Sequence, residues 1–179
     1  MKNTVITAAI VAASVIASPA MAEDGDFSGV KATAIAGYDN IDLNIAGVDS
    51  VDGFLYGVAL GYDHQSGNIV YGVEVEATES TGEISNAAGT AEVGRDLYAG
   101  GRLGFVAGDK ALIYTKAGYT NARSSSPGLG GANGDGFRVG GGVEYKLSEK
   151  IFARGEYRYS DYEAGVSRHQ GLIGLGVKF

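Results

Sequence analysis

The last eleven residues constrain the fold of this chain most strongly, because their side chains alternate in character with a period of two. From His169 to Phe179 the odd-numbered positions include Ile173, Leu175 and Val177, whereas the even-numbered ones are mostly glycine, glutamine and lysine. Successive side chains of a β-strand point to opposite faces, so this segment predicts a strand with one apolar face. Its length is that of a tilted membrane strand, ~9–11 residues. The alternative is an ordinary edge strand at the end of a soluble sheet.

The aromatic residue that ends the strand supports the membrane interpretation. A final strand closing on Phe179 resembles the last strand of the eight-stranded outer-membrane barrels, the OmpA-type and opacity-type proteins. In those families the barrel assembly machinery recognises the terminal aromatic strand. The resemblance therefore implies that Phe179 is part of a C-terminal assembly signal.

The N-terminal segment has the parts of a secretory signal peptide. A basic residue near the start precedes an apolar run, Val5–Ala17, and a small-x-small cleavage site that contains Ala20 and Ala22. The run is shorter than the ~18 apolar residues that a helical membrane anchor needs. We therefore predict that residues 1–22 are a cleaved signal peptide and that residues 23–179 form one barrel domain.

Composition narrows the classes of function. The chain has a formal net charge of −7, which is unfavourable for a nucleic-acid partner, because phosphate binding needs a basic face. It has no cysteine, which excludes disulfides and thiolate metal sites. Its 30 glycines stand against 2 prolines, and they are spread through alternating segments, so we expect them to serve close packing within strands.

Eight alternating segments cover the mature chain, and the connections between them are long and short in succession. An even number of strands with every second turn short is typical of outer-membrane barrels, and it places both termini in the periplasm. The sequence thus predicts an all-β fold, an eight-stranded antiparallel up-and-down transmembrane β-barrel. The expected strands are Ser28–Tyr38, Gly53–Asp63, Asn68–Thr78, Val93–Val106, Lys110–Asn121, Gly136–Leu147, Lys150–Asp161 and His169–Phe179.

Residue types decide which face of the sheet points inward. In the second segment Phe54 and Tyr62 flank aliphatic residues on one face, as expected where aromatic girdles border a hydrocarbon band. The opposite face carries charges spaced by glycines, which would weaken exposed strands but would make room for long side chains inside a narrow barrel. We therefore predict that the ionic face lines the lumen. A soluble lipocalin-like barrel has the opposite polarity and is the alternative.

The inward charges are of both signs, and unpaired charges in a narrow lumen would be costly, so we expect them to pair. A lumen filled in this way is a structural plug, and the alternative is a narrow, low-conductance pore for small solutes. The predicted network comprises Glu74, Glu76, Arg102, Lys116, Arg138, Glu144, Arg154, Glu156 and Arg158.

A second resemblance covers most of the chain. Ile151–Tyr162, Arg102–Phe105 and Leu112–Gly118 resemble strands of the small outer-membrane β-barrel "porin family" of alphaproteobacterial surface proteins. The resemblance implies an envelope structural or surface protein of the cell outer membrane. It implies no catalytic set and no cofactor. The expected partners are outer-membrane lipid, lipopolysaccharide and, during biogenesis, the barrel assembly machinery, and the barrel is expected to be a monomer.

A rim enzyme acting on lipid or peptide is the third candidate function, since such activity needs a histidine near a nucleophile or carboxylate. His169 follows Asp161, Glu163 and Ser167 in sequence, and His64 lies in an expected turn beside Asp63 and Ser66. Two isolated histidines cannot form a zinc site, so no metal site is predicted. A polar role for both histidines is the simpler interpretation, and we predict no enzyme activity.

The long connections are expected to be extracellular and to carry any specific binding. Two of them are acidic, and their carboxylates either share divalent cations near lipopolysaccharide or are simply solvated. The third, Ala122–Asp135, is rich in serine and glycine and is expected to be mobile. The acidic residues are Asp39, Asp42, Asp49 and Asp52 in the first connection and Glu79, Glu83 and Glu92 in the second.

Overall fold

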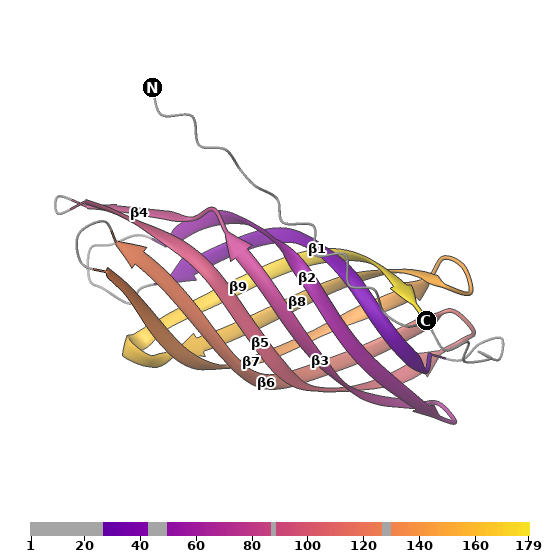
Figure 1. The fold of residues 1–179 in the computed structure, drawn as a ribbon. Helices are drawn as coiled ribbons and strands as arrows, with labels where there is room; N and C mark the ends of the chain where they lie inside the picture. The colour runs from indigo at the N-terminus through magenta and orange to yellow at the C-terminus, as the bar shows by residue number, and fades with distance from the viewer. Residues whose placement is uncertain (1–26, 43–49, 87–88, 127–129) are drawn as a thin grey trace.

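The computed structural model describes residues 27–42, 50–86, 89–126 and 130–179, and these residues form one β-barrel (Figure 1). Among them no helix is long and apolar enough to cross a membrane. The strands are β1 Gly29–Asp42, β2 Val51–Ser66, β3 Ile69–Ser80, β4 Glu83–Asn86, β5 Gly89–Ala107, β6 Ala111–Ser126, β7 Gly130–Lys146, β8 Ile151–Tyr162 and β9 Val166–Lys178, with a 3₁₀ turn η1 at Glu163–Gly165.

The sheet closes on itself because the first and last strands pair. β1 lies antiparallel to β9, from Lys31 opposite Lys178 to Asp42 opposite Ser167. β3 and the short β4 follow each other along the chain and both pair with β5, so together they count as one interrupted strand of the barrel. The wall therefore has eight antiparallel positions, as the sequence predicts, and closure removes the exposed edges of an open sheet.

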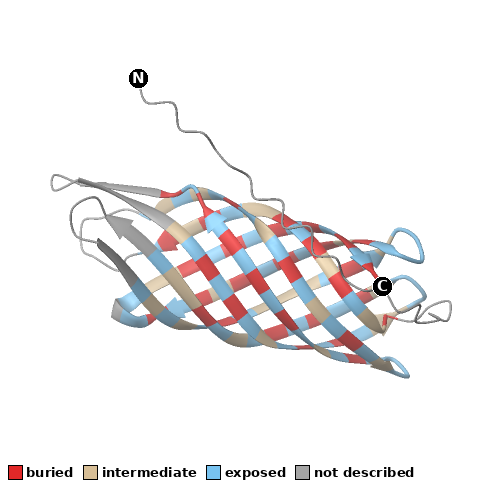
Figure 2. Ribbon diagram, viewed as in Figure 1, coloured by how far each residue is buried: buried red, intermediate tan, exposed pale blue. Residues whose placement is uncertain are grey.

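Buried and exposed residues alternate along the strands wherever their burial is described (Figure 2). The outward residues are the predicted apolar ones, such as Val73 at 63 % exposure and Ile173 at 71 %. Phe54 and Tyr62, at opposite ends of the outward face of β2, are also exposed. An apolar surface that surrounds the whole wall is suited to lipid rather than water. The predicted sidedness is therefore confirmed.

We call the end of the barrel with Phe27 and Phe179 the terminal mouth, and the opposite end, where β1 stops at Asp42, the distal mouth. Phe27 is fully buried in the terminal mouth, where it packs against Val70 and Leu112. The backbone N–H of Phe27 donates to the Oε1 of Gln65 over 2.8 Å. The first described residue thus lies inside the barrel.

Several strands extend further toward the distal mouth than the sequence predicts. The expectation of a mobile connection over Ala122–Asp135 was wrong, because residues 122–126 of β6 pair with residues 130–134 of β7. The two strands pair through their backbones there, and backbone pairing does not require an alternation of apolar and polar residues in the sequence. The expected connection Tyr162–Arg168 shrinks to η1, and Arg168 belongs to β9.

Glycines of the inner face accommodate aromatic rings more often than arginines. A Cβ at Gly100 or Gly176 would collide with the side chain of Tyr98 or Phe152, respectively. A Cβ at Gly174 would lie 3.0 Å from Cγ of Arg154, which is one of the few places where glycine makes room for an arginine. The glycines of the inner face thus serve close packing, as the sequence predicts, but they make room for aromatic rings as well as for arginines.

Candidate functional site

The candidate site is a single network of ion pairs that runs through the lumen. Strands β1–β3 and β5–β9 contribute to it, and the residues that it joins carry balanced charge. The cations are the seven residues Lys31, Arg102, Lys116, Arg138, Arg154, Arg158 and Arg168, and the anions are the seven residues Asp39, Asp63, Glu74, Glu76, Asp96, Glu144 and Glu156.

Glu76 is the most highly connected carboxylate of the network. Its side chain has no exposure, and its oxygens lie 2.5 Å from Nη1 of Arg158 and 2.7 Å from Nζ of Lys116. Arg154 and Arg138 complete the surroundings at 3.2 and 3.5 Å. Four cations from three other strands therefore depend on this one carboxylate for part of their compensation.

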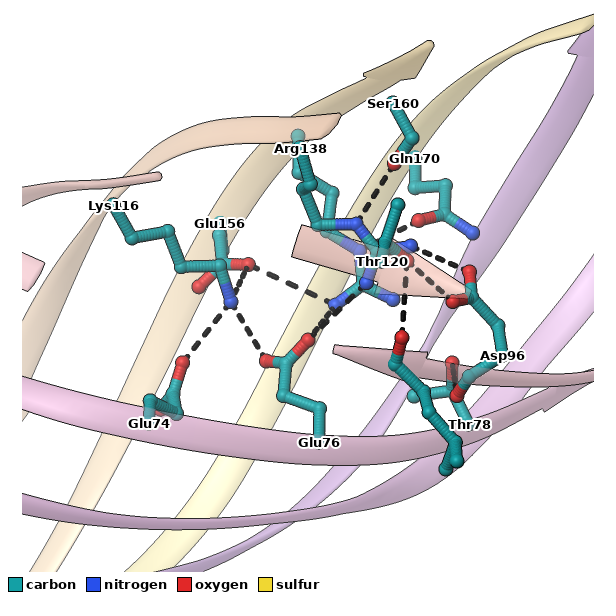
Figure 3. Close-up of polar contacts among 12 residues, drawn as sticks. Glu74, Glu76, Thr78, Asp96, Lys116, Thr120, Arg138, Glu156, Ser160 and Gln170 are labelled. Carbon is teal, nitrogen blue, oxygen red and sulfur yellow. Dashed lines mark hydrogen bonds and ion pairs between the residues drawn. The ribbon is translucent and has the colours of Figure 1, made fainter. Parts of the chain in front are cut away.

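Lys116 lies among three carboxylates in the middle of the lumen (Figure 3). Its Nζ is 3.0 Å from Glu74, 2.7 Å from Glu76 and 2.8 Å from Glu156. These three glutamates are also close enough together to surround a metal ion. The lysine ammonium already lies within contact distance of all three, so the cation of this cluster is part of the chain itself.

Asp96 organises the part of the network nearest the distal mouth. Its Oδ2 accepts hydrogen bonds from Nη2 of Arg138 at 2.5 Å and from the hydroxyl of Tyr162 at 2.7 Å. The hydroxyl of Thr120 donates to its other oxygen over 2.6 Å. Arg168 reaches the same carboxylate and also forms an ion pair with Asp39. Both carboxylate oxygens are therefore saturated by fixed donors.

A smaller group of charges closes the network near the terminal mouth. Nζ of Lys31 is 2.8 Å from Asp63 and 2.6 Å from Glu144, and Arg102 reaches Glu144 at 3.0 Å. The ring of Phe27 lies beside this group, with Nζ of Lys146 3.8 Å from its centroid. An aromatic ring and its cations thus cover the terminal end of the ionic lumen.

All nine sequence-predicted network residues line the lumen, and each of them forms at least one ion pair. The structure adds five members that the sequence analysis did not include, and two of them had been assigned elsewhere. Asp39 was predicted in an acidic loop and Arg168 in a connection, yet both are buried in the lumen. Those predictions were wrong because the strands were drawn too short. The added members are Lys31, Asp39, Asp63, Asp96 and Arg168.

The predicted rim residues do not form a catalytic arrangement. His169 points outward, and its Nδ1 lies 2.6 Å from the hydroxyl of Tyr157. Ser167 pairs with Asp161 across β8 and β9, two positions from His169 along the strand. His64 packs its ring against Tyr71 on the outer face, whereas Asp63 points into the lumen. Each histidine therefore has an aromatic neighbour on the lipid-facing surface.

The acidic residues of the expected loops lie in different places in the structure. Asp42 is exposed at the end of β1, and Glu79 is exposed on β3, where it accepts a hydrogen bond from Tyr56 over 2.8 Å. Glu83 and Glu92 pair with each other in register between β4 and β5. Asp49, like the predicted cleavage residues Ala20 and Ala22, lies outside the described residues.

A polar cluster on the outer face of β6 and β7 was not foreseen. Tyr119 and Asn121 both donate to the carboxylate of Asp135, the latter over 2.6 Å. Together they hold the pKa of Asp135 below its usual range, with the tyrosine hydroxyl the larger cause. Asn121 and Asp135 lie beyond Tyr119 and Phe137, the last outward aromatic residues of these strands, toward the distal mouth. It joins the two strands where they leave the apolar band.

The hairpin of β1 and β2 repeats this cluster. Asn40 donates to Asp52 over 2.7 Å, and hydrogen bonds from Tyr38 and then Asn40 lower the pKa of Asp52. The sequence carries the matching signal, because Gly-Tyr-x-Asn precedes and Asp-Gly-Phe follows the turn in both hairpins. A search for short internal repeats would therefore have found both clusters.

The fold and the lumen together define a class of protein. A closed eight-position barrel with an apolar outer wall, aromatic residues toward both ends and a charge-balanced interior is a transmembrane β-barrel. The family model described as outer membrane protein beta-barrel domain matches residues 8–179. The chain therefore belongs to this outer-membrane barrel family, and its location is the outer membrane.

Named relatives and solved structures agree with this assignment. The chain is 31 % identical over 142 residues to a 22 kDa outer membrane protein of Rhizobium leguminosarum bv. viciae, covering 71 % of this chain and 67 % of the relative. It is 27 % identical over 146 residues to a 25 kDa outer-membrane immunogenic protein of Brucella ovis, covering 80 % and 72 %. These relatives are named as outer-membrane proteins rather than as enzymes.

Two solved structures have the same fold at low sequence identity. Neisserial surface protein A aligns with a TM-score of 0.62 and 18 % identity, covering 85 % of this chain and 98 % of that one. The Ail protein of Yersinia pestis aligns with a TM-score of 0.58 and 16 % identity, covering 85 % and 99 %. At this identity the similarity shows a small single-barrel fold and no shared activity.

Proposed function

We propose that the protein is a sealed structural and surface component of the outer membrane, with a lumen that does not carry solutes. The observation that supports this proposal is the burial of the ionic network. Arg138 and Arg158 have no exposure, and Glu144 has 1 %. Seven cations and seven anions fill the lumen in ion pairs, so an incoming solute would have to displace bonded side chains.

The competing proposal, a narrow low-conductance pore, makes a different prediction in a planar bilayer. We expect the purified barrel to show no steady single-channel current, because buried, ion-paired side chains fill the lumen. Heat-modifiable migration on a gel would verify that the inserted protein is folded. A reproducible steady current on the nanosiemens scale from folded protein would contradict the sealed lumen and favour the pore.

The same reasoning supports a role without catalysis. A hydrolytic rim site needs a histidine within hydrogen-bond reach of a nucleophile and oriented by a third group. The hydrogen-bond partner of His169 is the phenol of Tyr157, and the ring of Tyr159 lies 4.9 Å away, centroid to centroid. Histidine with two tyrosines is the composition of an interfacial aromatic girdle.

We also propose that the distal mouth faces the cell exterior and that the barrel is monomeric. In this orientation the outer face of the distal half contacts lipopolysaccharide, and the terminal mouth opens to the periplasm. Short turns such as Gly67–Asn68, between β2 and β3, then lie on the periplasmic side, as in other outer-membrane barrels.

The terminal aromatic residue provides a test of the proposed assembly partner. The backbone N–H of Phe179 donates to Val30 over 2.9 Å, while its side chain is exposed on the outer face. We expect Phe179→Ala to lower the folded protein in outer-membrane fractions several-fold, yet to refold in detergent as well as the wild type. Phe137→Ala, which truncates an exposed aromatic residue on β7, is the control and should assemble normally. If the two variants reach the outer membrane in equal amounts, Phe179 is not part of an assembly signal.

A further inference from the structure

Two arginines of the outer face lie close together at the distal mouth. Arg95 precedes the outward Leu97 on β5 by two residues, and Arg123 follows the outward Tyr119 on β6 by four residues, so both lie on the distal side of these apolar residues. Both side chains are exposed. A strand rises about 3.3 Å per residue, so both residues leave the apolar band by roughly the depth of a lipid headgroup layer.

A β-bulge brings the two arginines opposite each other. The pairing of β5 with β6 shifts between Val93 and Asp96, so Gly94 and Arg95 together face Arg123. A Cβ at Gly94 would lie 2.8 Å from the carbonyl oxygen of Arg123, which shows how closely the two strands approach there. Bulges often redirect a side chain next to a functional site.

Neither arginine forms an ion pair with the described carboxylate nearest to it. Glu79 lies opposite Arg95 across β3 and β5, but it accepts its hydrogen bond from Tyr56. Asp135 lies near Arg123 on β7, and its Oδ1 accepts hydrogen bonds from both Tyr119 and Asn121. Among the side chains that the structure describes, no carboxylate lies within the 4.0 Å ion-pair distance of either guanidinium.

We infer that Arg95 and Arg123 form a binding site for a phosphate group of lipopolysaccharide in the outer leaflet. Like charges opposite each other on one face of a sheet destabilise the pair, and a bound anion removes that cost. Guanidinium groups bind phosphate through charge-assisted, often bidentate, hydrogen bonds. This inference rests on the proposed orientation, in which the distal mouth lies in the lipopolysaccharide leaflet.

The test compares binding of phosphorylated and dephosphorylated lipid A to the folded barrel in zwitterionic detergent micelles. We expect the wild type to bind phosphorylated lipid A at least about tenfold more tightly than the dephosphorylated form, as charge-assisted bonds imply. The double variant Arg95→Gln/Arg123→Gln should bind both forms with the weaker affinity. Heat-modifiable migration of the variant shows that it is folded.

The control variant Lys110→Gln/Lys150→Gln removes two exposed cations from the turns near the terminal mouth and should bind like the wild type. The site would be overturned if the wild type bound both forms of lipid A equally well. It would also be overturned if the control variant lost as much affinity for phosphorylated lipid A as the arginine variant. Phosphatidylglycerol that competes as well as phosphorylated lipid A would overturn the assignment to lipopolysaccharide. The conductance measurement is independent, so a conducting barrel would refute the sealed lumen without affecting this site.

Discussion

Replacing Glu76 by glutamine is expected to lower the free energy of unfolding by about 3–5 kcal/mol, the usual cost of breaking a buried ion pair from one side. Glutamine keeps the size of the side chain but removes its charge. Arg158, Lys116, Arg154 and Arg138 would then share fewer anions in a lumen that excludes water. Urea unfolding in detergent micelles, followed by loss of heat-modifiable migration, measures the change.

Glu79→Gln is the matched control, because Glu79 lies on the same strand, three residues away, but is exposed on the outer face. We expect it to stay within about 0.5 kcal/mol of the wild type, as surface substitutions usually do. Adding Arg158→Gln to the Glu76 variant should cost less than the sum of the single changes, because each variant already removes the shared contact. If the losses of unfolding free energy of the two single variants add strictly, Glu76 and Arg158 do not interact and the proposed network is contradicted.

Periodicity and residue type together predicted most of the fold and most of the site. Alternation in β8 puts Arg154, Glu156 and Arg158 on one face and Tyr157 on the other, and the structure has them so. A strand has only two faces, and the face that contacts lipid cannot carry charges within the apolar band without a large cost. The charged face could therefore be assigned to the lumen and the apolar face to the lipid.

The five missed network members show where that argument stopped. Asp63 has the parity of the inner face of β2 and was placed at the end of the predicted strand, but it was not counted among the inward charges. Asp39 has the parity of the inner face of β1, but it was placed in a connection, because aspartate next to asparagine is also typical of a turn. Strand ends are set by partner strands, and a single segment does not contain that information.

The choice of partners in the network also could not come from the sequence. Arg154 reaches Glu74, which is 80 positions away in the chain, and Arg168 reaches Asp39, 129 positions away. Such pairs depend on strand tilt and on register around the whole barrel, which hydrogen bonding between neighbouring strands determines. The sequence could predict that charges pair, but not which ones.

A methyl group added at Gly118 is expected to destabilise the barrel more than its size suggests. Gly118 faces Gly100 directly across β5 and β6. A Cβ at Gly118 would collide with backbone atoms of that strand and would lie 2.9 Å from the carbonyl carbon of Ala99. Backbone atoms cannot turn aside as a side chain can, so the pairing of β5 with β6 must shift. We expect Gly118→Ala to lower the free energy of unfolding by about 1–3 kcal/mol, a typical cost of overpacking.

Gly155→Ala and Gly171→Ala separate this effect from the general difference between glycine and alanine. Both glycines lie on strands, on the outward face, and a Cβ at either would meet nothing within 4 Å. Alanine there restricts the unfolded chain without a collision, so we expect no loss and a gain of up to about 1 kcal/mol. In the same urea titration, the unfolding midpoint should therefore fall for the inner glycine variant and stay the same or rise for the two outer ones. If all three variants lose stability equally, the inner glycines are not required by close packing, and the account of how this narrow lumen accommodates its side chains is wrong.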